Sequence, residues 1–374
     1  MIKKFVTLFV VSLLVIGAVL YVVQLDRAGS KTLVVPDDYA TIGWAVGNAT
    51  AGDTVYVRSG TYNESVSIDK PLSLIGEDMS STVIFSEGRR GSGYTIHVKA
   101  DKVTVSGFTI KSYHPFHSLY YFYGIGIRGN NCNITGNKIE NCREGITSSA
   151  SVHSVTISKN IIKDTTAGMG ILFIYAIPHH ITITDNTITN TTYGIGVQEG
   201  YSYVISGNNV INNGGGIGIR GSDSTITGNN VTSNTGEGIN IYGSNNTILG
   251  NYVADNKVGV TFTGSNTTDN LFYNNSFDND QNVQITSTNY AESWDNGTIG
   301  NYWSDYNGVD ITLDGIGNTP YIIDENNKDN YPLMEPVEPT IIPEFPSWTI
   351  LPLLIAATLV GVTVRNKIRK KGLE

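Results

Sequence analysis

The chain has 374 residues, a formal net charge of −9 and only 15% charged residues. Eight of its 24 basic residues but only three of its 33 acidic residues lie within residues 1–28 and 344–374, so the body between these ends is more acidic than the whole, which argues against nucleic acid as a partner. Glycine is abundant, with 41 residues, as is typical of turn-rich β-structure rather than of helices.

The first 28 residues contain an apolar stretch that follows two lysines. Lys3 and Lys4 precede Phe5–Val23, a run of 19 residues that is long enough to span a membrane. No clear cleavage site follows, so this segment is either a signal peptide or an uncleaved signal anchor. In both cases we expect the body to be exported. Nine Asn-x-Ser/Thr sequons are compatible with a glycosylated exterior, or arise by chance in a chain rich in Asn and Thr.

Short strand-like segments begin after residue 30. Thr41–Asn48 reads as a short N-capped helix lying over the open end of a stack of strands. Gly52–Val57, Gly60–Val66 and Leu72–Gly76 follow with the alternation of β-strands. The stretch VPDDYATIGWAV, followed by AGDTVYVRSGTYNESVSIDKPLSLIGE, resembles the opening coil of the pectin-lyase-like superfamily, especially its NosD-type branch. This resemblance implies a right-handed parallel β-helix among surface and periplasmic proteins, with carbohydrate-binding and sugar-hydrolysing relatives.

The central part of the chain repeats one phrase every 21 to 25 residues. One strand of each copy begins with a glycine, and Asn, Gly, Ser and Thr fill the turns. Segments this short cannot bury an apolar face alone, so successive copies must stack. We therefore predict an all-β fold, a single-stranded parallel β-helix over residues 29–290. The repeated glycine indicates either a positive φ or a close approach of two backbones.

An asparagine recurs at one corner of successive coils. Stacked parallel strands lie ~4.8 Å apart, so each side-chain amide can donate to one neighbour and accept from the other. Phe108 takes this position one coil before the series, and Asn301 continues it loosely at the other end. The predicted ladder consists of Asn137, Asn160, Asn186, Asn208, Asn229, Asn251 and Asn275.

Two insertions interrupt the regular coils, Lys111–Tyr123 and Leu172–His180. Insertions in solenoids fall at corners and often on the binding face. We expect the two to share one aromatic wall that stacks on sugar rings, or alternatively to pack their loops against the coils. The predicted glycan-binding residues here are His114, His117, Tyr120, Tyr121, Tyr123, Tyr175 and His179, with Phe116 and His180 in the same wall.

Outward positions on the glycine-led strands form a second candidate surface. Gln198, Arg220 and Tyr242 each stand four residues after a glycine and are expected on successive coils, within reach of one extended ligand. An arginine there suits an acidic polysaccharide, whereas the alternative interpretation is a solvated polar face. Cys132 and Cys142 are about half a coil apart, and we predict two small buried residues rather than a disulfide across the coil.

No catalytic constellation is evident. The paired aspartates and the Gly-His-Gly motif of polygalacturonases are missing, and Tyr113–His117 lacks both aspartates of the mannuronan-epimerase signature that it faintly resembles. The charged residues that can converge on one site are Arg128, Arg143, Glu144, Glu199 and Glu237. The copper role suggested by the family's usual name lacks support, because His, Met and Cys are scattered.

The texture of the sequence changes near residue 291. NGTIGNYWSDY and DGIGNTPYIIDENNKDNYPLM resemble the closing segment of NosD-type proteins, so we interpret residues 291–335 as a C-terminal cap. Tyr302, Trp303 and Tyr306 are expected to cover the last coil. Hard oxygen ligands at Asp310, Asp314 and Asn318 predict a calcium site, the one cofactor that the sequence suggests.

The last residues indicate a membrane anchor. A Pro-rich spacer over residues 336–347 leads to an apolar run of 17 residues, Trp348–Val364, and then to a basic tail within residues 348–374. This order predicts a second transmembrane helix with the body outside the cell. PEFPSW resembles the tail signals of archaeal surface proteins, which implies a sortase-like processing enzyme as an alternative to a retained helix.

These observations predict a membrane-anchored β-helix protein of the cell surface that binds a polysaccharide or surface glycan without catalysis. The first alternative is a polysaccharide lyase, epimerase or hydrolase acting at the aromatic insertions. The second is a structural spacer.

Overall fold

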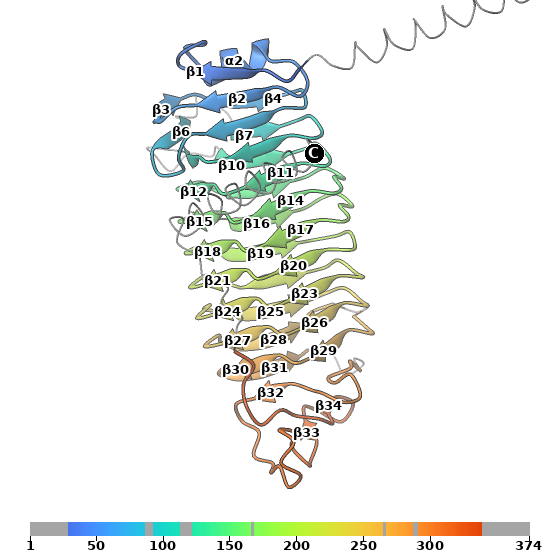
Figure 1. Ribbon diagram of the computed structural model, residues 1–374. Helices are drawn as coiled ribbons and strands as arrows, with labels where there is room; N and C mark the ends of the chain where they lie inside the picture. Colours follow the sequence, from blue (N-terminus) through green and yellow to red (C-terminus); the bar gives the residue numbers. More distant parts are fainter. Residues whose placement is uncertain are drawn as a thin grey trace, which may run out of the picture. The chain divides into compact units, whose positions relative to one another are not determined.

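The chain winds into a right-handed parallel β-helix in which each coil adds one strand to each of three parallel sheets (Figure 1). The computed structural model describes residues 29–86, 93–112, 122–165, 168–264, 267–286 and 291–338. Strands of one sheet pair with their counterparts one coil away, as in the register Ile134↔Ile157 and Ile157↔Ile183. The prediction of a stacked all-β parallel helix is therefore confirmed.

Sheets A and B have eleven strands each within the described residues. Sheet A contains β1 (Thr32–Val35), β2 (Thr54–Val57), β5 (Ser73–Gly76), β8 (Thr104–Ser106), β11 (Asn133–Thr135), β14 (Thr156–Ser158), β17 (Thr182–Thr184), β20 (Val204–Ser206), β23 (Thr225–Thr227), β26 (Thr247–Leu249) and β29 (Leu271–Tyr273). Sheet B contains β3 (Gly60–Asn63), β6 (Thr82–Ser86), β9 (Thr109–Ser112), β12 (Lys138–Glu140), β15 (Ile161–Lys163), β18 (Thr187–Thr189), β21 (Asn209–Ile211), β24 (Asn230–Thr232), β27 (Tyr252–Ala254), β30 (Ser276–Asp278) and β32 (Tyr302–Trp303).

Sheet C has ten strands in the same part of the chain, and the cap adds a two-stranded antiparallel sheet. Sheet C contains β4 (Val66–Ile68), β7 (Gly93–Val98), β10 (Phe122–Ile127), β13 (Ile146–Ser148), β16 (Met169–Phe173), β19 (Tyr193–Val197), β22 (Ile217–Ile219), β25 (Glu237–Ile241), β28 (Val258–Phe262) and β31 (Gln281–Ile285). The small sheet consists of β33 (Tyr321–Ile322) and β34 (Lys328–Asp329).

The core is a set of stacked aliphatic columns inside the coils. Along β10, Ile125 and Ile127 point into the core and are buried, whereas Gly126 between them faces outward, where a Cβ would meet the ring of Tyr94. Full burial of each Ile or Val stabilises the fold by roughly 1.5–3 kcal/mol. The glycine column is explained by backbone approach, because a Cβ at Gly145 would lie 2.5 Å from the carbonyl oxygen of Gly170.

The predicted asparagine ladder is confirmed at the turn between sheets A and B. The Nδ2 of Asn160 donates to Oδ1 of Asn186 at 3.0 Å, and its backbone N–H donates to the same oxygen. Asn275 continues the ladder to Asn301, whose Oδ1 accepts its amide at 2.8 Å. The fully buried amides therefore all find partners from coil to coil.

The other two corners carry asparagine ladders that the sequence did not predict. At the turn between sheets B and C, Asn213, Asn234, Asn256 and Asn279 bond in series. At the turn between sheets C and A, the backbone N–H of Ser224 donates to Asn246, and that of Asn246 donates to Asn270. Their spacings of 21 to 24 residues match the coil repeat, so this periodicity of asparagines in the sequence could have predicted both ladders.

Both ends of the described coil stack are covered, as predicted. Helix α2 (Ile42–Asn48) is N-capped by Thr41, whose Oγ1 accepts from Trp44 N at 3.1 Å, and it buries Ile42 and Ala45. At the other end the ring of Trp303 stacks on Phe277 with centroids 4.9 Å apart. Trp294, which the sequence did not single out, stacks in the same way on Phe272 at 4.5 Å.

The two cysteines lie inside the coils and form no disulfide. Cys132 and Cys142 are buried and unbonded, as predicted, and burial raises the pKa of the Cys142 thiol to about 11. No helix among the described residues is long and apolar enough to cross a membrane. Both predicted membrane helices, over residues 1–28 and 348–374, lie outside the described residues.

Candidate functional site

The two insertions join opposite ends of the strands of sheet C. The first lies between β9 of sheet B and β10 of sheet C, whereas the second follows β16 of sheet C and precedes β17 of sheet A. The two insertions therefore lie at two different corners, one where the chain enters sheet C and one where it leaves, and the shared aromatic wall stays a prediction. What they have in common is the outer surface of sheet C, which we call face C. His114, Phe116, His117, Tyr120 and Tyr121 lie outside the described residues.

A cluster of rings lies on face C beside the first insertion. Tyr123 is in register with Tyr94 of the preceding coil, and their ring centroids are 5.2 Å apart. The ring of Tyr94 also lies 4.6 Å from that of His97. Tyr94 extends across Gly126, where a Cβ would come within 2.3 Å of the tyrosine ring, so a larger residue there would displace this ring. We call Tyr94, His97 and Tyr123 the ring cluster; only Tyr123 was predicted.

Charged side chains surround the ring cluster and set its protonation. Burial lowers the pKa of His97 to about 4, and the positive charges of Lys99 and Arg128 add to this effect. Its buried Nε2 has no hydrogen-bond partner in the structure. Burial also raises the pKa of Tyr94, with the charge of Arg128 opposing and that of Glu144 adding. At neutral pH the ring cluster thus combines a neutral imidazole with a protonated phenol, and the charge of Arg128 acts on both.

The charged residues predicted to converge do so only in part. Glu144 lies near Tyr94, and burial raises the pKa of this carboxyl against the hydrogen bond of Thr147 and the charge of Arg143. Glu199 follows β19, two coils and about 10 Å along the axis from Glu144. Glu237 begins β25, four coils and about 19 Å from Glu144. They therefore do not join one site with Arg128 and Glu144.

The second candidate surface is arranged on face C as predicted. Val197, Ile219 and Ile241 are in register, so the residues that follow them, Gln198, Arg220 and Tyr242, lie on three successive coils. The guanidinium carbon of Arg220 lies 4.3 Å from the centroid of the Tyr242 ring, a cation–π contact that joins two coils.

A hydrogen-bonded network lies near this pair on face C. The hydroxyl of Tyr193 and the amide of Asn240 both donate to Oε1 of Glu237 at 3.2 Å. The ring of Tyr193 covers Gly215 and Gly218 of the next coil. Because these polar groups satisfy one another, the network holds the neighbouring strands in place.

His179 of the second insertion lies in a stack of rings at the corner between sheets C and A. The His179 ring lies 5.3 Å from that of His153 on one side and 5.1 Å from that of Tyr201 on the other. Both faces of His179 are covered by these neighbours, so its ring edge alone remains available to a ligand. Tyr175, in contrast, is 82% exposed. Tyr201 and His153 were not predicted, although each stands one coil from His179.

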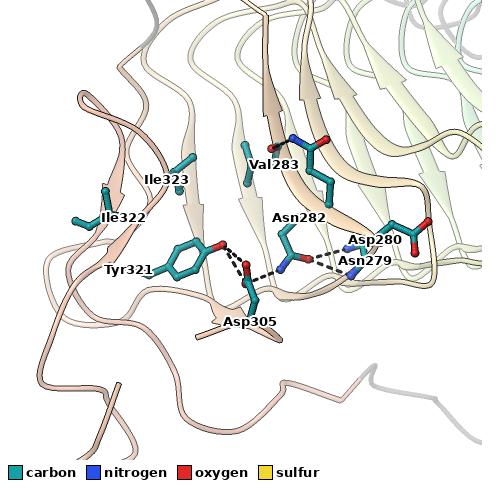
Figure 2. A pocket seen from close by; sticks show the side chains of 9 residues that line it. Asn279, Asp280, Asn282, Val283, Asp305, Tyr321, Ile322 and Ile323 are labelled. Atoms are coloured by element: carbon teal, nitrogen blue, oxygen red, sulfur yellow. Dashed lines mark hydrogen bonds between the residues drawn. The ribbon is translucent and has the colours of Figure 1, made fainter. Parts of the chain in front are cut away.

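A pocket of about 250 Å³ lies between β31 and the cap (Figure 2). At its centre the hydroxyl of Tyr321 donates to both carboxylate oxygens of Asp305 at 3.0 Å, and the Asn282 amide donates at 2.9 Å. The pocket was not predicted, and its central polar groups are bonded to one another. Its lining consists of Asn279, Asp280, Gln281, Asn282, Val283, Asp305, Tyr321, Ile322 and Ile323.

The predicted calcium ligands lie in one loop of the cap. The Asp310 carboxylate accepts from the backbone N–H groups of Leu313 at 2.6 Å and Gly315 at 2.8 Å. The Asp314 carboxylate accepts from Ile316, and Asn318 Oδ1 accepts from Ile311. Within the described ranges, no group of three or more His, Cys, Asp or Glu side chains can hold a metal ion. The calcium site stays a prediction.

The fold and its ladders define a right-handed parallel β-helix protein. A family model described as "Periplasmic copper-binding protein (NosD)" matches residues 46–222 and 131–308 of the chain. The chain belongs to this family, as the resemblance of its opening and closing segments implied. No match was found among curated proteins.

Three solved structures are similar to the chain, and the first of them, with a TM-score above 0.5, supports the same fold. An alginate lyase from Paenibacillus sp. str. FPU-7 is 16% identical, with a TM-score of 0.51, and the alignment covers 70% of this chain and 98% of that one. The pectate lyase Pel9A is 14% identical over 72% of this chain and 80% of its own, with a TM-score of 0.49. The A-module of the Azotobacter vinelandii mannuronan C-5 epimerase AlgE4 is 15% identical over 67% and 92%, with a TM-score of 0.45.

Proposed function

We propose that this protein binds polysaccharide on face C and does so without catalysis. The observation that carries the proposal is the ring cluster with Arg128 beside it. Tyrosine rings stack on the apolar faces of sugars, and an arginine adds a charge-assisted bond to an acidic or hydroxyl-rich ligand. Rigid parallel strands hold these groups, so little conformational entropy is lost on binding. We further propose an extracellular location and a membrane anchor at the chain ends.

A second candidate function is β-elimination or epimerisation of a polyuronate at the same cluster. The neutral His97 and the protonated Tyr94 favour it, because these two reactions need a base and an acid near an arginine that neutralises the uronate carboxylate. Against it stands the buried position of His97 Nε2, which a substrate proton cannot reach without movement of its neighbours. We therefore rank binding first.

The experiment that tests both is a glycan array on the full-length protein in detergent, run beside an ultraviolet assay for unsaturated uronate products and an NMR assay for epimerised residues. We expect binding to one class of polysaccharide, with no unsaturated or epimerised product. Tyr94→Ala and Arg128→Ala should each weaken binding about fivefold or more, since ring stacking and charge-assisted bonds each contribute about 1–3 kcal/mol.

Tyr252→Ala provides the matched control, because Tyr252 is a half-buried tyrosine on the outside of sheet B. Loss of binding in that variant as well would mean that face C is not the site. Formation of unsaturated or epimerised uronate would identify the ring cluster as an active site. Binding to no glycan would favour the interpretation of the protein as a structural spacer.

Copper is not part of the proposal. The rings of His153 and His179 stack with their planes 26° apart, so their nitrogen lone pairs do not point at a common centre. The buried thiols of Cys132 and Cys142 carry raised pKa values, which disfavours the thiolate that copper needs.

For calcium we propose the cap loop that contains Asp310, Asp314 and Asn318. An ion bound there would stabilise the folded state by mass action, so millimolar calcium should raise the melting temperature and chelator should lower it. Asp314→Asn should abolish the difference. An unchanged melting temperature in calorimetry would remove the site.

A further inference from the structure

Three cations on face C have no acidic partner among the residues that the structure describes. Lys99, Arg128 and Arg220 are exposed, and none of them forms an ion pair within the described part of the chain. Each follows a strand of sheet C directly, at the same place in its coil. In an acidic protein this leaves one column of cations for an external anion.

Both arginines combine their charge with aromatic rings. The charge of Arg128 acts on Tyr94 and His97 of the ring cluster, and Arg220 lies 4.3 Å from the Tyr242 ring centroid. Each place thus offers the same pair of contacts: a guanidinium for a carboxylate and a ring for a sugar face. An acidic polysaccharide presents this combination at every residue.

The two places are separated by a fixed distance. Arg128 follows β10 and Arg220 follows β22, and β13, β16 and β19 lie between these strands in sheet C. Four steps of ~4.8 Å place the arginines about 19 Å apart along the axis. The positions between them in the same column are Ser149, Ile174 and Gln198, which carry no charge that would repel a polyanion.

We propose that face C binds an extended acidic polysaccharide at two points, Arg128 and Arg220, so that only a chain that reaches both binds tightly. This inference rests on the proposed function and names its ligand class and minimum length. Taking the advance of one sugar residue as about one coil spacing, ~4.8 Å, we expect the ligand to need about five residues to span both points. Binding at the second point is then intramolecular. This raises the affinity by about a hundredfold or more over that of either point alone, with no contact beyond those two points.

The test is calorimetric titration of the full-length protein in detergent with oligogalacturonates from trimers to octamers. The expected result is a steep rise in affinity, about a hundredfold, between trimers and hexamers, followed by a plateau. Arg128→Ala and Arg220→Ala should each abolish the rise, so that octamers bind like trimers. The double variant should lose less than the two single losses combined, because either single variant already breaks the bridge, and it should also weaken trimer binding, because neither point then keeps its arginine. Lys159→Ala, which removes an exposed cation at another corner, should change nothing.

The outcomes separate the two levels of the proposal. Affinity that grows only in proportion to chain length, or arginine effects that simply add, would overturn two-point binding while leaving glycan binding intact. Equal affinity for neutral galactose oligomers would overturn the acidic ligand class. Absence of binding to every glycan would remove the proposed function itself.

Discussion

A single asparagine side chain of the main ladder makes more hydrogen bonds than its size suggests. Asn208 donates through Nδ2 to Ile183 O at 2.8 Å and to Asn229 Oδ1 at 2.9 Å. Its own Oδ1 accepts from the backbone and side chain of Asn186 at 3.0 and 2.9 Å. Removal of one buried amide therefore leaves groups in two neighbouring coils without partners, each at a cost of about 1–3 kcal/mol.

We predict that Asn208→Ala lowers the free energy of unfolding by about 2–5 kcal/mol. Asn209→Ala is the matched control, because this next residue faces outward on sheet B and is half buried. Its loss should cost about 1 kcal/mol or less. Urea unfolding followed by circular dichroism measures both. Similar effects at the two positions would refute the view that the buried ladder dominates.

Glu140 is the residue at which pH should act most clearly in the acid range. Its side chain is 7% exposed and contacts Lys111 at 2.7 Å and Lys138 at 2.8 Å. Burial opposes ionisation, but the hydrogen bonds and charges of these lysines outweigh it and lower the pKa to about 2. The folded state thus prefers the charged form, which stabilises it above the unfolded pKa and is lost as pH falls through about 2.

We therefore expect the free energy of unfolding to fall below pH ~4.3, with about 3 kcal/mol of the loss due to Glu140. Glu140→Gln should be less stable at neutral pH and should lack this part of the slope. The difference between the two stability curves isolates the residue from other carboxylates. A constant difference from neutral pH to about pH 2 would argue against the assignment.

At the scale of elements, the cap meets the ladders with acceptors. Each ladder donates its backbone N–H groups toward the C-terminal end, so the last N–H of each needs an acceptor beyond the coils. Asn301 donates to Asp329 at 2.6 Å, and Asn270 donates to Glu292 at 2.7 Å. The third ladder ends when Asn279 donates to Asn282 at 3.0 Å. Carboxylates suit such an end, because aligned amide dipoles leave positive charge there.

Burial gives Asp329 the opposite pH dependence from Glu140. It raises the pKa of Asp329 to about 6, although the N–H groups of Asn301, Trp303 and Tyr331 oppose the shift. The folded state holds the proton more tightly than the unfolded state, so this stabilisation is complete below pH ~3.9 and is lost as pH rises through about 6. Scans of thermal unfolding from pH 4 to 7 should show a loss of about 3 kcal/mol from this group.

Asp329→Asn should remove that part of the pH dependence whatever its effect on absolute stability. Glu292→Gln is the companion variant, because burial raises the pKa of Glu292 as well. If the difference between Asp329→Asn and the natural chain did not change from pH 4 to 7, the carboxyl would not titrate in this range.

On the scale of the whole molecule, the described coils contact mainly their neighbours, so stability should be distributed as in a one-dimensional array. The C-terminal cap seals this array through Trp303, which is fully buried between Phe277 and Tyr321. Loss of the cap would expose the last strand edges to solvent and to other chains.

We predict that Trp303→Ala, at a local cost of about 3–5 kcal/mol, speeds amide exchange in the last coils, around β26 to β31, and leaves β8 to β16 unchanged. Hydrogen exchange read by mass spectrometry on peptides resolves the two regions. Uniformly faster exchange along the chain would show that the coils unfold as one cooperative unit instead.

The sequence alone determined the architecture of the coils, since the residues that specify each coil lie close together in the chain and recur in every repeat. The coil length, the ladder from Asn137 to Asn275, the capping helix after Thr41 and the covering Trp303 all follow from spacing and turn chemistry. Gln198, Arg220 and Tyr242 were placed correctly for the same reason, because one repeat separates them. A periodic pattern determines which residues of successive coils stack on one another.

Only the tertiary structure decided which side chains from different parts of the sequence lie side by side on the surface of the coils. Tyr94 meets Tyr123 of the next coil although an insertion changes the spacing between β7 and β10, which hides their register in the sequence. The two insertions join opposite ends of sheet C, and Asp329 reaches Asn301 across the cap. Such neighbours depend on where each corner turns and on which way each side chain points, and these are set by packing across the coil rather than by any repeat along the chain.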